Sequence, residues 1–215
     1  MIRRPWILVM AAGRARRFGA PKLLARIGRE SLLRRAVKVA LGSRPAGCVV
    51  VLGAQAPRLQ AELRGYPVRV VVNRRWRSGL ASSLRAGLAA LPREASAALV
   101  LLADQAAVGP AELELVMAAG RQAPRSIVAA GAGPVLCPPV LFPRRLFGAL
   151  RRLRGDAGGR RLLTRFQNGL VVMEIPAGVL DVDRVADLAR FRRQDRLSRE
   201  ARGGSSVVAA PRQRG

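Results

Sequence analysis

The sequence contains no histidine, which removes several classes of active site at once. Zinc sites built on imidazole and Ser-His or Cys-His nucleophile pairs both require that side chain, so neither is available. The only cysteines, Cys48 and Cys137, do not form a Cys-x-x-Cys motif, and Cys48 lies inside an apolar run. We therefore expect both thiols to be small core or near-core residues of a cytoplasmic protein.

Long apolar runs are also missing. The longest runs have the length of β-strands, so no membrane span is expected. The first five residues are too few, and the apolar run after them is interrupted too soon, for a secretory signal. Aromatic residues make up only 4% of the chain, so stacking platforms for nucleic-acid bases are scarce. We expect no membrane partner, and nucleic acid is disfavoured.

Acidic residues are few as well, with 13 against 39 lysines and arginines and a formal net charge of +26. Such a charge is typical of nucleic-acid-binding proteins. Here, however, the arginines are scattered over predicted helices, loops and the C-terminal tail. The only lysines are Lys22 and Lys38, so arginine stands almost everywhere that lysine could. We interpret the charge as a bias in residue usage, and Lys22 stands out against it.

Strand-like apolar runs alternate with helix-period stripes along most of the chain. The predicted strands are 6–12, 48–52, 68–72, 97–103, 126–130 and 171–175. The predicted helices are 30–41, 57–63, 80–91, 110–119, 144–153, 159–166 and 185–193. Residues 131–143, rich in glycine and proline, predict a loop with a short projecting strand. The alternation predicts an α/β three-layer sandwich with a mostly parallel, Rossmann-like sheet over residues 1–194, followed by a disordered Arg/Ser/Gly-rich tail over 195–215.

The stretch from Trp6 to Lys22 joins a buried strand to a basic, glycine-containing loop. Ligands of such sheets bind beyond the carboxyl ends of the strands, where backbone N–H groups and cations hold phosphate. Three carboxylates, those of Asp104, Asp181 and Asp183, are predicted at the same edge. Mg²⁺ takes one or two carboxylates together with water and phosphate oxygens, so this combination predicts a magnesium–phosphate site. Taken singly, each aspartate also suits a helix cap, and the loop a solvated turn.

The loop is neither a Walker P-loop nor a dinucleotide fingerprint, but MAAGRARRFGAPK resembles the LAAGxGxRFGxxK signature of MobA-like nucleotidyltransferases. The molybdenum cofactor cytidylyltransferase branch is the most similar. Further resemblances follow in the family's order, and together they span residues 6–190. They are NRRWRSGLASSL at 73–84, LLADQ at 101–105, GDAGGRRLL at 155–163 and LDVDRVADL at 180–188.

The resemblance implies a fold of the nucleotide-diphospho-sugar transferase type and a role for each matching position. The implied nucleotide-binding residues are Ala11, Ala12, Gly13, Arg17, Lys22, Leu52, Gly53 and Ser83; the implied catalytic residues are Arg17, Lys22 and Asp104; the implied magnesium ligands are Asp104 and Asp183. The Ala-Ala pair, where guanylyl enzymes carry glycines, implies CTP over GTP. The implied reaction transfers CMP to the terminal phosphate of molybdopterin with release of pyrophosphate, and a molybdoenzyme or its chaperone is a further implied partner.

Several positions depart from the family pattern, namely Ala15, Ala103, Ala106, 137–139 and Arg184. Residues 133–139 are expected where the acceptor binds, so the sequence leaves the acceptor open. One alternative is a cytidylyl- or guanylyltransferase for another phosphorylated acceptor. The other is a non-catalytic relative that binds nucleotide or RNA.

Overall fold

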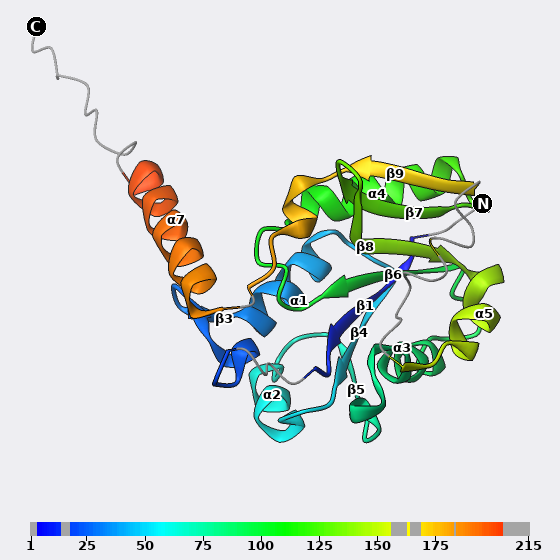
Figure 1. Cartoon of the computed structure of the whole chain (residues 1–215), viewed down its shortest axis with the longest axis horizontal. Coiled ribbons are helices and arrows are strands. Elements are labelled where there is room, and N and C mark those ends of the chain that lie inside the picture. The colour runs from blue at the N-terminus through cyan, green and yellow to red at the C-terminus, as the bar shows by residue number, and fades with distance from the viewer. Residues whose placement is uncertain (1–3, 14–17, 156–162, 164–168, 183, 204–215) are drawn as a thin grey trace, which may run out of the picture.

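The computed structural model of the chain describes residues 4–13, 18–155, 163, 169–182 and 184–203. Within them a seven-stranded sheet runs in the order β5-β4-β1-β6-β8-β7-β9 (Figure 1). Every pairing in it is parallel except the two made by β8. The strands are β1 (Trp6–Ala11), β4 (Gly47–Leu52), β5 (Arg69–Val72), β6 (Ala97–Leu102), β7 (Ile127–Ala132), β8 (Val135–Pro143) and β9 (Leu170–Glu174).

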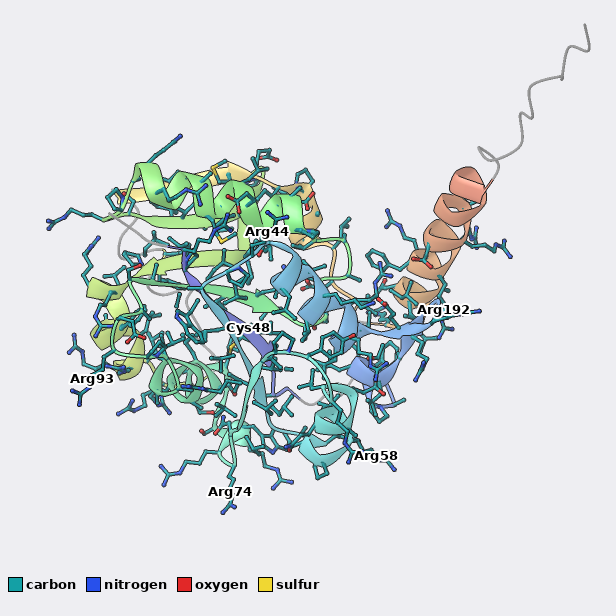
Figure 2. The ribbon with its side chains drawn as sticks, turned by 180° about the vertical axis from the view of Figure 1, so that it is seen from behind. Arg44, Cys48, Arg58, Arg74, Arg93 and Arg192 are labelled. Carbon is teal, nitrogen blue, oxygen red and sulfur yellow. The ribbon has the colours of Figure 1, made fainter. Side chains whose placement is uncertain are left out.

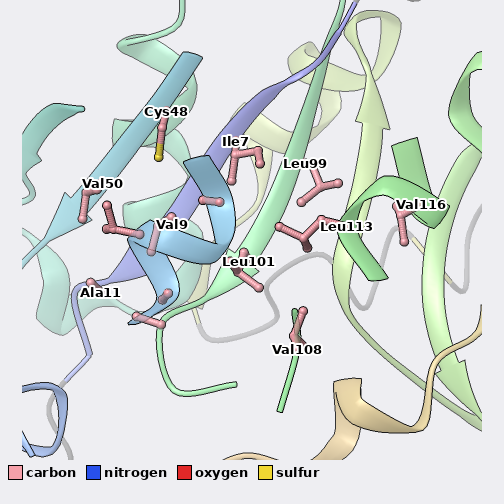
Figure 3. Packing of buried hydrophobic residues seen from close by; sticks show 14 of the residues in the cluster. Ile7, Val9, Ala11, Cys48, Val50, Leu99, Leu101, Val108, Leu113 and Val116 are labelled. Carbon is pink, nitrogen blue, oxygen red and sulfur yellow. The ribbon is translucent and has the colours of Figure 1, made fainter. Parts of the chain in front are cut away.

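Helices cover both faces of the sheet, so the predicted α/β three-layer arrangement is confirmed. The covering helices are α1 (Leu32–Gly42), α2 (Ala56–Glu62), α3 (Leu80–Ala89), α4 (Pro110–Gln122) and α5 (Phe147–Arg152), and a further helix, α7 (Val185–Gly203), follows the last strand. Alternate residues of β1 point to opposite faces, as the period of a strand requires. Ile7 and Val9 pack with α1 and α4 (Figure 3). Leu8 and Met10 pack with α3 and α5 on the other face.

Ser31 begins α1 and links it to α2. Its hydroxyl accepts a hydrogen bond from the Arg34 amide at 3.3 Å, as an N-cap does, and donates to Glu62 Oε2 at 2.7 Å. The apolar stripe that predicted this helix is buried against the sheet. Ser31 also ends a two-stranded hairpin, β2 (Arg26–Ile27) with β3 (Glu30–Ser31), which lies outside the main sheet.

The prediction that residues 131–143 form a loop with a short projecting strand is wrong. Residues 135–143 form β8, which lies inside the sheet between β6 and β7. Two of the prolines that suggested a loop, Pro138 and Pro139, fall where β8 makes no ladder pairs. Ala129 pairs with Val140 and Ala130 with Cys137, so Pro138 and Pro139 occupy the bulge between them. A residue without an N–H is tolerated in a strand at such a position.

The last helix is longer than predicted. The expected helix ends at residue 193, whereas α7 continues to Gly203, into the segment predicted as tail. Leu188 is buried against the hairpin side of the domain, the Arg35–Asp195 ion pair is 3.2 Å long, and Arg192 Nε donates to the Arg26 carbonyl at 2.8 Å. From this base, α7 projects away from the domain (Figure 1). The predicted helix 159–166, except Leu163, and residues 204–215 lie outside the described residues.

Both thiols lie where the sequence predicted. Cys48, at the start of β4, is 2% exposed, and Cys137 is half-buried. Burial raises the pKa of the Cys48 thiol to about 12. No helix in the described part of the chain combines the length and the apolar character needed to cross a membrane.

The buried thiol makes stability fall at alkaline pH. The unfolded thiol ionises near its ordinary pKa of 9.0, whereas the folded thiol keeps its proton to about 12, so the folded state binds more protons in between. From pH 8 to pH 10.5 we expect the wild type to lose about 2 kcal/mol more unfolding free energy than Cys48→Val, measured by urea unfolding. Equal losses in the two proteins would show that Cys48 does not carry the effect.

Candidate functional site

Four neighbouring parallel strands bring the predicted site residues to one edge of the sheet. β1 ends at Ala11 and leads into Ala12 and Gly13, and β6 ends two residues before Asp104. β4 and β5, on the other side of β1, lead into Gly53 and Asn73. Parallel strands present their carboxyl ends together, so these loops form a common rim.

A cavity of about 580 Å³ opens at this rim, which is the size of a small-molecule site. Most of the predicted residues line it: Ala11, Ala12, Gly13, Lys22, Ser83 and Asp104. A second cavity, of about 850 Å³, adjoins it and shares with it Gly13, Lys22, Leu23, Trp76 and Arg77. Predicted residue Gly53 lines this second cavity. The Arg77 guanidinium lies over the Trp76 ring, 5.1 Å from its centre.

Lys22 and Asp104 form an ion pair in the wall of the first cavity. Lys22 begins the 3₁₀ helix η1 (Lys22–Leu24), and its Nζ lies 2.6 Å from Asp104 Oδ2. The two side chains are 10% and 22% exposed. Charges this far from water require a partner, so the pair ties the end of the basic loop to the end of β6. It also sets a positive and a negative group side by side at the rim.

The Asp104 carboxylate suits a divalent cation. It is an oxygen ligand that remains partly open to the cavity, and Mg²⁺ needs few protein carboxylates when phosphate and water complete its shell. Within the described residues, no group of three or more acidic or cysteine side chains forms a metal cage. The Val182 amide donates to the Asp104 carbonyl at 3.1 Å, which brings the predicted DVD segment next to Asp104. Asp183 itself lies outside the described residues, as does Arg17.

Gln105 holds the loop after β6 in place, a role that sequence reasoning missed. Its side chain is 5% exposed, and its Nε2 donates to the carbonyls of Pro138 at 2.7 Å and Gly178 at 2.6 Å. Its Oε1 accepts from the Leu102 amide at 3.2 Å. One amide therefore joins the end of β6, the bulge of β8 and the segment that leads to Val182. The LLADQ motif marks the position without revealing these partners.

Gly53 allows the loops after β1 and β5 to meet. A Cβ added there would lie 2.5 Å from the Ala12 carbonyl oxygen and 2.6 Å from the Trp76 Cβ, closer than real Cβ contacts. Only glycine fits between them without displacing backbone. Trp76 was not predicted to line the site, although it lies in the NRRWRSGLASSL segment.

Leu52 differs from the expectation that it binds nucleotide. Its side chain is 0% exposed and packs in the core, and it is absent from the described lining of both cavities. A leucine at the end of a central strand is directed by the strand's period into the sheet's apolar face. Its part in the rim is a backbone one, because its carbonyl accepts from the Asn73 amide at 2.8 Å.

Comparison with known proteins identifies a family. Residues 7–169 match the model of the MobA-like NTP transferase domain. The chain is 32% identical over 165 residues to nicotine blue oxidoreductase of Paenarthrobacter nicotinovorans, covering 73% of this chain and 79% of that protein. It is 29% identical over 180 residues to the purine catabolism protein PucB of Bacillus subtilis, covering 78% and 85%.

Solved structures agree with this match. Rv0371c from Mycobacterium tuberculosis superposes with a TM-score of 0.79 at 28% identity, over 90% of this chain and 100% of that one. A second structure of Rv0371c, at 27% identity, a TM-score of 0.75 and coverage of 89% and 99%, is a complex with manganese. A relative thus occurs with a divalent metal. Structures at 12% and 14% identity share the fold, which is that of the nucleotide-diphospho-sugar transferases.

The three hydrogen bonds of the Gln105 side chain, called here the Gln105 clamp, predict an effect on stability. Gln105→Leu leaves the Pro138 and Gly178 carbonyls without their amide donor, so the free energy of unfolding should fall by about 2 kcal/mol. Gln60→Leu, on an exposed position of α2, is the matched control and should stay within about 0.5 kcal/mol of the wild type. Urea unfolding measures both, and an equal change in the two variants would contradict the clamp.

Proposed function

The chain belongs to the MobA-like NTP transferase family, and we propose that within this family of nucleotidyltransferases it transfers CMP from CTP to the terminal phosphate of molybdopterin. The cavity at the carboxyl edge of the sheet carries the proposal. It gathers the Ala11–Gly13 loop, Ser83 and the Lys22–Asp104 pair around a space of about 580 Å³. That combination suits a ligand with an uncharged ring at one end and a strongly anionic group at the other.

The proposed reaction is an in-line displacement at phosphorus. An oxygen of the acceptor's terminal phosphate attacks the α-phosphorus of CTP and forms a new P–O–P bridge. The bond between the α-phosphorus and the oxygen leading to the β-phosphorus breaks, and pyrophosphate leaves with that electron pair. Such transfers need positioning and cations more than covalent help from the protein. A chain without histidine can therefore perform the reaction.

The cations that would contact the phosphate groups lie in the walls of the two cavities. Lys22 and Arg77 line both cavities, so each can contact the triphosphate or the groups leaving it. Arg77 is held over the Trp76 ring, which restricts its guanidinium. When bound, Mg²⁺ neutralises charge on the phosphate oxygens, and Asp104 is the described carboxylate that would hold it, with Asp183 proposed as its partner. Lys22 Nζ lies 2.6 Å from that carboxylate, so each of the two charges has a partner of opposite sign.

The base and the acceptor follow from the resemblance. Ala11 and Ala12 both line the cavity. Their Ala-Ala pair, where guanylyl enzymes carry glycines, supports CTP over GTP through the resemblance. Molybdopterin is proposed because the motifs are most similar to the cytidylyl branch. The product would pass to a molybdoenzyme or its chaperone. The names of the curated relatives specify neither a nucleotide nor such an acceptor, so the assay must compare several of each.

We expect pyrophosphate release with Mg²⁺, CTP and molybdopterin, and much less with GTP, UTP or ATP, in a coupled phosphate assay. Mass spectrometry of the pterin product should show the added CMP. Faster release with GTP would overturn the base assignment. Release only with another phosphorylated acceptor would overturn the molybdopterin assignment alone. No release of pyrophosphate with any nucleotide, together with salt-sensitive RNA binding, would refute the proposal that this chain is a nucleotidyltransferase.

The two lysines provide a matched pair of variants. Lys22→Ala removes the ammonium from the cavity wall, so kcat/KM should fall about 100-fold or more. Lys38→Ala removes an exposed lysine paired with Glu30 on the hairpin side, and its activity should stay within about twofold of the wild type. Circular dichroism checks that both fold. Comparable activity in the two variants would show that the triphosphate does not bind beside Lys22.

A further inference from the structure

A third apolar cluster lies outside the two main cores of the domain. It is named here the hairpin cluster, because β2 contributes one of its residues. Most of its members lie between residues 18 and 32, and three lie between 182 and 191, so contacts between an early and a late part of the chain close it. The buried members are Phe18, Ile27, Leu32, Val182 and Leu188, and Leu23, Ala25, Ala106 and Phe191 pack against them.

Lys22 is flanked on both sides by members of the hairpin cluster. Phe18 precedes it by four residues and is 8% exposed, and Leu23 and Ala25 follow it. The Lys22 side chain itself reaches the rim, where it meets Asp104 and lines both cavities. The apolar neighbours of Lys22 thus pack in the cluster, while its ammonium lies in the ligand space.

The helix η1, which Lys22 begins, is too short to be rigid by itself. The Leu24 amide donates to the Pro21 carbonyl and the Ala25 amide to the Lys22 carbonyl, both at 2.9 Å. The Leu32 amide donates to the Ala25 carbonyl at 2.9 Å, which joins η1 to the start of α1. A single 3₁₀ turn has few internal hydrogen bonds and is stabilised mainly by the packing around it. The position of Lys22 therefore depends on the hairpin cluster.

The first turns of α7 complete the hairpin cluster. Leu188 is 3% exposed within it, and Phe191 is half-buried against it. Beside them, Arg192 Nε donates to the Arg26 carbonyl in β2 at 2.8 Å. Figure 1 shows this base of α7 next to the hairpin, from which the rest of the helix projects. α7 thus holds the hairpin, and η1 with it, against the domain.

The two members of the Lys22–Asp104 pair are held by different means. The Gln105 clamp fixes the loop of Asp104 through the Pro138 and Gly178 carbonyls. Lys22 is held by the apolar packing that α7 completes. A shift of about 1 Å in a group that contacts the substrate can lower the rate about 100-fold. Loss of a side chain from α7 should therefore displace Lys22 while the clamp still holds Asp104.

We propose that Leu188 and Phe191 are positioning residues for Lys22: from α7, through the hairpin cluster, they hold η1 so that the Lys22 ammonium meets the triphosphate. This inference rests on the proposed function, because it takes Lys22 to contact the triphosphate. Neither residue is among the described residues that line the two cavities, so both act through Lys22. α7 therefore contributes to the reaction although it lies outside the site.

Leu188→Ala and Leu150→Ala form a matched pair of variants. Both delete the same atoms from a buried leucine, but Leu150 is on α5, which follows β8 at the edge of the sheet opposite the rim. Both should lower the midpoint of urea unfolding. With Mg²⁺, CTP and molybdopterin, or the substrate pair that the wild type prefers, kcat/KM for pyrophosphate release should fall about tenfold or more in Leu188→Ala. It should stay within about threefold of the wild type in Leu150→Ala and in Leu188→Met, which refills the space.

Lys22→Ala completes a double-mutant cycle. If Leu188 acts through the ammonium, then adding Leu188→Ala to Lys22→Ala should lower kcat/KM by less than about threefold further. A further loss as large as in the wild-type background would overturn the inference, because the effect would not pass through Lys22. Equal losses of activity in Leu188→Ala and Leu150→Ala would overturn it as well.

Amide hydrogen exchange tests the same inference without relying on activity. In Leu188→Ala, the amides of Leu24, Ala25 and Leu32 should exchange about tenfold faster than in the wild type, and those of α5 should change less. In Leu150→Ala the order should be reversed. Unchanged exchange at η1 in a folded Leu188→Ala protein would overturn the inference. A wild type that releases no pyrophosphate with any nucleotide would refute the proposed function, and exchange would then decide alone whether α7 holds η1.

Phe191→Ala serves if circular dichroism shows that Leu188→Ala does not fold. Phe191 is half-buried, so its loss opens the hairpin cluster less than the loss of Leu188. We expect kcat/KM to fall about threefold to tenfold in the wild-type background, and by less than about twofold when Lys22→Ala is already present. Full activity in Phe191→Ala, together with unchanged exchange of the Ala25 amide, would overturn the inference.

Discussion

The contact between Lys22 and Asp104 is the interaction on which the site depends. One residue begins η1 and the other follows β6, and the two would each be costly to leave away from water without the other. Their 2.6 Å ion pair joins the basic loop to the sheet and places one positively and one negatively charged side chain in the cavity wall. A ligand that combines anionic phosphate with a divalent cation offers a new partner to both charges at once.

Two buried carboxamides support this arrangement in parallel ways. Gln105 connects the loop after β6 to β8 and to the segment before Val182, and Asn73 connects the loop after β5 to α3. Each amide uses its oxygen and both its hydrogens on fixed partners. Polar groups that are fully satisfied in a low-dielectric environment act as rigid spacers. The rim therefore has a defined shape although it consists of loops.

The sequence predicts the edge of the sheet well and its internal bonding poorly. Lys22 stands out by composition, and Asp104 by its place after an apolar run, because both signals are local. The Pro138 and Gly178 carbonyls that Gln105 binds lie 33 and 73 residues further along the chain, so no local pattern contains them. The serine partners of Asn73 lie in the same NRRWRSGLASSL segment, which marks the residues without revealing their hydrogen bonds. Pro138 and Pro139 led to the wrong prediction of a loop, because a strand tolerates them only at the bulge in its pairing with β7, which the sequence does not reveal. α7 was predicted too short because bonds from Asp195 and Arg192, rather than an apolar stripe, attach its polar part.

The arginines that project from the domain in Figure 2, among them Arg58, Arg74 and Arg93, have a kinetic consequence. Between residues 44 and 93 the only acidic residue is Glu62, and it is engaged by Arg34 at 3.1 Å. This stretch, which supplies Gly53, Trp76 and Arg77 to the second cavity, therefore carries charge almost entirely of one sign, which draws anions in from solution. Salt shortens the reach of such a field to about 8 Å at physiological ionic strength. Capture of a polyphosphate by this protein is thus governed by the ionic strength of its surroundings as well as by the fit of the cavity.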